Sequence, residues 1–106
     1  MGDKAYITTW DPDWYVYPSE PGYVKVLNLQ NLEIESSIEV GIMPEDMIFH
    51  DNYLWVANSG ESSAMKIDIL SNSIVQNLEV GQGPTSFTSY DGDIYLSRTF
   101  YDDSWN

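Results

Sequence analysis

A unit of about 40 residues recurs along this chain, and this repeat constrains the possible folds more than any other feature of the sequence. Three pairs of similar segments stand 40 residues apart in the same order: LNL and IDI at 27–29 and 67–69, IEVG and LEVG at 38–41 and 78–81, LWV and IYL at 54–56 and 94–96. Pro44 and Pro84 keep the same spacing. The segment AYIT at 5–8 also resembles LWVA at 54–57, but a longer loop follows it. This order predicts a chain built from copies of one structural unit.

Each unit is predicted to consist of short strands separated by turns. Residues 53–58 are aromatic and β-branched, and turn-forming residues flank them on both sides. Three further segments have a similar length and apolar content: 23–29, 34–40 and 64–69. Alternation along 34–40 predicts one strand face formed by Ile34, Ser36, Ile38 and Val40. Because no segment of about ten residues has a helical period, the expected fold class is all-β.

The strand pattern divides the chain into three repeat units, at about residues 4–41, 42–81 and 82–106. If the strands of one unit are lettered A to D, the chain runs B-C-D, A-B-C-D, A-B, with an incomplete last unit. A four-stranded antiparallel repeat of this length is typical of a β-propeller blade. Residues 1–106 are therefore predicted to form a single propeller segment of about two and a quarter blades. Further blades, in a longer chain or in a homo-oligomer, are the expected partners, because closed propellers have roughly 4–8 blades.

The second unit also carries a family resemblance. The segments LWVANSG at 54–60, KID at 66–68 and LEVG at 78–81, with Pro44 before them, resemble the YVTN-type repeat of bacterial and archaeal surface-layer and exported propellers. The resemblance covers about residues 4–100, although SR at 97–98 stands where the second unit has AN. It implies a propeller fold and a periplasmic, cell-surface or secreted location. Proteins of this shape include surface lipoproteins that capture cobalamin or glycans, as well as lyases and quinoprotein-like dehydrogenases, so the resemblance favours no single ligand.

Charge and composition exclude several kinds of partner and site. The chain has 17 acidic residues against 4 Lys and Arg, a formal net charge of −13. Four scattered cations cannot form the basic surface that nucleic acids require, so no nucleic-acid partner is expected. No apolar run approaches the ~18 residues of a membrane span, and membrane insertion is not expected either. The absence of cysteine excludes disulfides and thiolate metal sites.

Two loops that follow B-type strands share the pattern aromatic-Asp-x-x-Trp. The candidate binding residues are those of these two loops with two neighbouring tyrosines: Trp10, Asp11, Asp13, Trp14, Tyr15, Tyr17, Tyr101, Asp102, Asp103 and Trp105. Aromatic rings beside carboxylates suit stacking on a sugar or another planar ligand, and they also attract cations. The alternative is that these rings pack against the neighbouring unit and are structural. The expected ligand is therefore a glycan or a small planar molecule, bound by one face of the domain.

The same loops supply the residues from which a metal site could be built. Calcium prefers several oxygen ligands and could use Asp11, Asp13, Asp102 and Asp103, but the EF-hand spacing is absent and no other cofactor is evident. The single histidine, His50, precedes a turn and is expected to be a turn residue. No nucleophile stands at a recognisable spacing from a base, so a non-catalytic binding scaffold is the first hypothesis. The alternatives are a fragment of a propeller enzyme with its catalytic groups elsewhere, and a purely structural assembly module.

Overall fold

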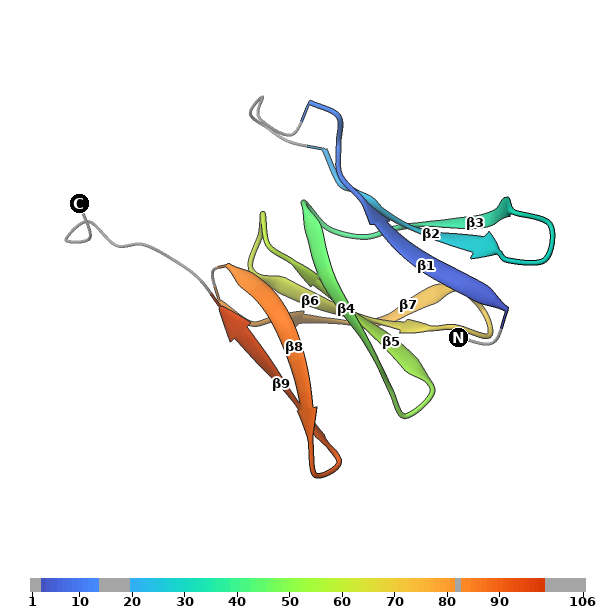
Figure 1. Ribbon diagram of the computed structural model, residues 1–106. Helices are drawn as coiled ribbons and strands as arrows, with labels where there is room; N and C mark the ends of the chain where they lie inside the picture. The colour runs from blue at the N-terminus through green and yellow to red at the C-terminus, as the bar shows by residue number, and fades with distance from the viewer. Residues whose placement is uncertain (1–2, 14–19, 82, 99–106) are drawn as a thin grey trace.

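The computed structural model describes residues 3–13, 20–81 and 83–98, and these residues form antiparallel strands and no helix (Figure 1). The strands are β1 (Lys4–Thr9), β2 (Tyr23–Asn28), β3 (Glu33–Glu39), β4 (Pro44–His50), β5 (Tyr53–Asn58), β6 (Ser63–Asp68), β7 (Ser73–Glu79), β8 (Pro84–Tyr90) and β9 (Asp93–Arg98). The predicted all-β fold class is confirmed. The predicted strand 53–58 has the same bounds as β5, and the other three predicted strands lie within one residue of β2, β3 and β6.

The strands form three separate sheets that follow one another across the molecule. The first sheet has the order β1-β2-β3, the second β4-β5-β6-β7 and the third β8-β9, and within each sheet the strands pair in the order of the sequence. In Figure 1 the second sheet, green to yellow, lies between the blue first sheet and the orange third sheet. Backbone contacts between sheets run from β1 to β4 and from both β4 and β5 to β8. The molecule is accordingly flat, with extents of 50 × 38 × 20 Å.

The sequence repeat is also a repeat of backbone conformation. Left-handed φ angles, which favour glycine and asparagine, recur 40 residues apart in four pairs: Leu32 and Asn72, Met43 and Gly83, Asp51 and Asp91, Asn52 and Gly92. Irregularities in strand register recur in the same way, at 26–27 and 66–67 and at 44–46 and 84–86. The backbone N–H of Val40 donates to the carbonyl of Gly22, and that of Val80 donates to Ser62 at equivalent positions. Bends and junctions of each unit are therefore built alike.

One predicted strand face is wrong at its first residue. The register pairs Val26 with Ser36 and Leu27 with Ile34, so a bulge at Glu35 interrupts the alternation along β3. Neighbouring residues of β2 point to opposite faces of the sheet, so Ile34 lies on the face opposite Ser36 and Ile38. Ile34 is accordingly 50% exposed, whereas Ile38 and Val40 are buried.

The core lies between the first and second sheets. Eight buried residues form it, four from each side: Val24, Val26, Ile38 and Val40, and Leu54, Val56, Met65 and Ile67. The rings of Tyr6 and Phe49 meet edge to face beside this cluster, with centroids 5.2 Å apart. Burying each aliphatic side chain of this size is worth roughly 1.5–3 kcal/mol. Packing between the sheets therefore holds the first two units together.

Candidate functional site

The first predicted loop begins with a tryptophan that is held in place. Trp10 directly follows β1, and its indole N–H donates a hydrogen bond to the carbonyl oxygen of Pro44 at 2.9 Å. Pro44 begins β4, so this bond ties the loop of the first sheet to the leading strand of the second. The ring itself remains 40% exposed. Trp10 therefore presents an oriented aromatic surface to solvent.

Asp11 follows Trp10 in the same loop, and its carboxylate accepts two backbone hydrogen bonds. One carboxylate oxygen accepts the backbone N–H of Asp13 and the other accepts the backbone N–H of Glu20, both at 2.9 Å. These bonds, first that from Glu20 and then that from Asp13, lower the pKa of Asp11 below its ordinary value. The carboxylate thus stays ionised to lower pH and joins two chain segments on either side of 14–19. Its main contacts are structural.

Trp10 and Asp11 border a cavity of about 540 Å³ next to the ends of β1, β2 and β3, which we call the loop cavity. Its lining residues are Thr9, Trp10, Asp11, Pro12, Glu20, Pro21, Tyr23, Lys25 and Glu39. The Tyr23 hydroxyl donates to the Glu39 carboxylate at 3.5 Å, and the Lys25 ammonium lies 5.3 Å from the centre of the Tyr23 ring. The loop cavity therefore combines two aromatic rings with three carboxylates and one ammonium group.

The described residues contain only part of the predicted site. Trp10 and Asp11 line the loop cavity, and Asp13 belongs to the same loop without lining it. The other candidates lie outside the described residues: Trp14, Tyr15, Tyr17, Tyr101, Asp102, Asp103 and Trp105. The predicted pairing of two similar loops therefore remains a prediction. Glu39 was not predicted, and it reaches the cavity because the β2–β3 register places it opposite Tyr23.

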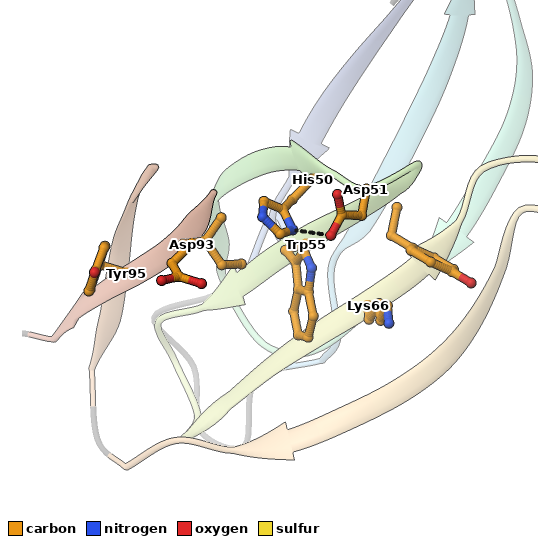
Figure 2. A pocket seen from close by; sticks show the side chains of 8 residues that line it. His50, Asp51, Trp55, Lys66, Asp93 and Tyr95 are labelled. Atoms are coloured by element: carbon orange, nitrogen blue, oxygen red, sulfur yellow. Dashed lines mark ion pairs between the residues drawn. The ribbon is translucent and has the colours of Figure 1, made fainter. Parts of the chain in front are cut away.

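A second aromatic and charged cavity, which we call the edge cavity, lies between the second sheet and β9 (Figure 2). It measures about 620 Å³ and is lined by His50, Asp51, Tyr53, Trp55, Lys66, Asp93, Ile94 and Tyr95. The Lys66 ammonium lies 4.1 Å from the ring centre of Tyr53 and 5.7 Å from that of Trp55. Tyr53 and Trp55 stand two residues apart in β5, so they share a face. Tyr53 and Trp55 are separated by one residue, as are Asp93 and Tyr95 in β9. This shared spacing is the sequence feature from which the cavity could have been suspected.

His50, the predicted turn residue, is the last residue of β4 and joins two turns. Its Nε2 atom lies 2.8 Å from the carbonyl oxygen of Gly92, in the turn between β8 and β9. Its Nδ1 atom lies 3.4 Å from the carboxylate of Asp51, the pair dashed in Figure 2. These contacts link equivalent turns of the second and third sheets, so the ring has a structural position.

Metal binding by the acidic loops stays a prediction. Within residues 3–13, 20–81 and 83–98, no three His, Asp or Glu side chains lie close enough together to hold a metal ion. Asp102 and Asp103, half of the possible calcium ligands, are not among those residues. The described part of the chain also contains no helix long and apolar enough to cross a membrane.

Comparison with known proteins assigns no family. No protein-family model matches the chain, and no curated protein sequence matches it at the required significance. The site therefore has to be argued from its own geometry.

Proposed function

We propose that this chain is a non-catalytic binding scaffold made of propeller-type blades of the YVTN kind. Support comes from the coincidence of the sequence repeat with repeated turns, bulges and junction hydrogen bonds. Repeat units of this kind bury their faces only against neighbours, as the first and second sheets do here. Further blades are the corresponding partners. An extracytoplasmic location belongs to the proposal and rests on the resemblance to exported propellers alone.

The ligand half of the proposal rests on the loop cavity. The observation that carries it is the hydrogen bond from Trp10 to Pro44, which orients a 40% exposed indole ring in the cavity that Tyr23 also lines. Oriented rings stack on the apolar face of a sugar with little loss of conformational entropy. The carboxylates of Glu20 and Glu39 can accept hydrogen bonds from sugar hydroxyl groups. The class of ligand that this combination suits best is a neutral glycan.

The glycan proposal is tested by adding a panel of neutral oligosaccharides to the chain and recording two-dimensional NMR spectra. We expect a binding sugar to shift the indole N–H signal of Trp10 and the backbone signals of residues 20–25. Tyr23→Ala should weaken that binding about two- to tenfold, since stacking on one ring is worth roughly 0.5–1.5 kcal/mol. Tyr95→Ala, which removes an exposed ring from the edge cavity, is the matched control and should leave it unchanged.

Two other outcomes would contradict the assignment of the site to the loop cavity. If Tyr95→Ala weakens sugar binding and Tyr23→Ala does not, the edge cavity is the binding site. If no sugar in the panel shifts any signal of the loop cavity, the glycan proposal is wrong, whereas the repeat architecture is untouched.

A further inference from the structure

The outermost strand of the second sheet, β7, has an exposed edge. It pairs with β6 on one side, and no other described strand of the sheet lies on its other side. All seven residues of β7 are exposed, and they include Ile74, Val75 and Leu78 at 39%, 51% and 36%. An edge strand has unpaired backbone N–H and C=O groups, to which a further strand can add. Soluble proteins therefore usually protect such an edge.

The equivalent edge strand of the first sheet, β3, is protected by charge. It has glutamate at three positions, whereas β7 has glutamate at only the last of them. The equivalent pairs, 40 residues apart, are Glu33 and Ser73, Glu35 and Val75, and Glu39 and Glu79. Lys4 neutralises one carboxylate of β3, that of Glu35, at 2.7 Å, so two remain on β3 against one on β7. Carboxylates on an edge repel the strand of another acidic chain, and β7 has lost most of this protection.

Residues 73–78 of β7 (SIVQNL) also have the composition of a segment that pairs with its own copies. They combine apolar and amide side chains and contain no charge, no proline and no glycine. Segments of this composition pair with identical segments when an exposed edge presents them. The turn before β7, at 69–72, is uncharged as well. The strand that suits this edge best is therefore a second copy of β7.

We propose that β7 is an interface between two copies of this chain, in which the two β7 strands pair antiparallel across a two-fold axis. The register of β6 with β7 skips Val75, so a bulge interrupts the strand there and regular pairing is expected at 76–79. If Asn77 or Leu78 lies at the axis, the two Glu79 carboxylates lie on opposite sides of it and do not face each other.

The proposed contact closes at two copies. Both chains use the same edge, so a dimer leaves no β7 edge free for a third chain. The glutamates of β3 oppose growth of the assembly at the first sheet. This contact joins strand edges, whereas the contact between the first and second sheets buries their faces. The inference goes beyond the proposed function and depends neither on further blades nor on glycan binding.

Net charge sets the conditions under which the dimer forms. Each copy carries a formal charge of −13, so two copies repel each other at low ionic strength. Salt screens this repulsion, with a Debye length of about 8 Å at 0.15 M. The uncharged segment 73–78 loses nothing by this screening, because its pairing rests on backbone hydrogen bonds and apolar contacts. Added salt should therefore strengthen the dimer.

Sedimentation velocity of the full chain over a range of protein concentrations tests the interface. We expect a monomer–dimer equilibrium that shifts toward the dimer as the salt rises from about 0.01 to 0.5 M, with slower amide hydrogen exchange in β7. Val75→Glu gives β7 the glutamate that β3 has and should weaken the dimer about tenfold, since a symmetric interface contains the substitution twice. Ser37→Glu adds the same charge to β3, and as the matched control it should leave the dimer unchanged.

Val75 and Ser37 are both exposed, and circular dichroism checks that each variant keeps its strands. The inference is overturned if the chain stays monomeric at every concentration and salt, or if Ser37→Glu weakens the dimer as much as Val75→Glu does. It is also overturned if slower exchange appears in β3 or β9 and not in β7. Assemblies of three or more copies without protection of β7 would overturn it too and would support rings of blades. No sugar is present, so the glycan proposal is tested separately.

Discussion

The side chain of Asn58 holds the backbone of Gly41 at the junction between the first and second sheets. Asn58 is 0% exposed, and its Oδ1 atom accepts the Gly41 N–H at 3.1 Å while its Nδ2 group donates to the Ser63 hydroxyl at 3.0 Å. Glu61 completes the network by accepting from the Ser63 hydroxyl and from the N–H of Ile42. One buried amide thus joins the end of β5, the start of β6 and the β3–β4 junction.

Asn58→Ala should lower the free energy of unfolding by about 1–3 kcal/mol, because the buried Gly41 N–H loses its acceptor. Urea unfolding followed by circular dichroism measures this loss. Asn77→Ala on the exposed strand β7 is the matched control and should change stability by less than about 0.5 kcal/mol. Equal effects of the two substitutions would mean that the Asn58 network does not stabilise the junction.

Gly41→Ala should also destabilise the chain, for reasons of space. An added Cβ atom would lie 2.7 Å from side-chain atoms of Asn58 and Glu61, which are held by the network and cannot move without breaking it. Overpacking of this kind costs about 1–3 kcal/mol. Gly92→Asn is the contrasting change, since Gly92 has open space around it and the equivalent Asn52 has the same left-handed φ. A thermal melt in which Gly41→Ala is as stable as Gly92→Asn would contradict this packing.

Leu54→Ala should cost about 2–5 kcal/mol, because it opens a cavity in the core between the first two sheets. Leu70→Ala removes the same atoms from a turn residue that is 94% exposed, and it should leave stability within about 0.5 kcal/mol. Chemical denaturation of both variants measures the difference. Similar midpoints for the two would show that the sheets are not packed as described.

The ion pair between Lys4 and Glu35 predicts a pH effect. The Lys4 ammonium lies 2.7 Å from the Glu35 carboxylate, and its hydrogen bond, followed by that from Asn28, lowers the pKa of Glu35. A lowered pKa in the folded state adds stability above the ordinary pKa of Glu, and this stability is lost as the pH falls through the lower, folded-state value. We therefore expect Glu35→Gln to flatten the loss of stability between about pH 5 and 3.

NMR titration of the Glu35 carboxyl carbon tests the cause directly. Lys4→Gln should raise the pKa of Glu35 toward its ordinary value, and Asn28→Ala should raise it by less, following the order of the two causes. An unchanged titration in Lys4→Gln would mean that the ion pair does not form in solution.

Part of the candidate site could be predicted because it lies in one loop. Trp10 and Asp11 were recognisable as aromatic and acidic residues after a strand, and both line the loop cavity. Glu39 was not, because only the pairing of β2 with β3 brings it opposite Tyr23. The edge cavity was missed for the same reason. Its rings and charges come from two sheets, and the spacing of residues within one strand says nothing about which sheet that strand faces.

The sequence by itself determined the strands, their antiparallel order and the turns between them. Short-range steric preferences decide these features, and the spacing of 40 residues predicts where Asp51 and Asp91 take the same left-handed conformation. Only the tertiary structure decided which face each residue occupies. A bulge turns Ile34 outward, and the stacking of the first and second sheets buries Asn58 completely. Register and sheet stacking depend on contacts between residues far apart in the chain, and no local pattern encodes them.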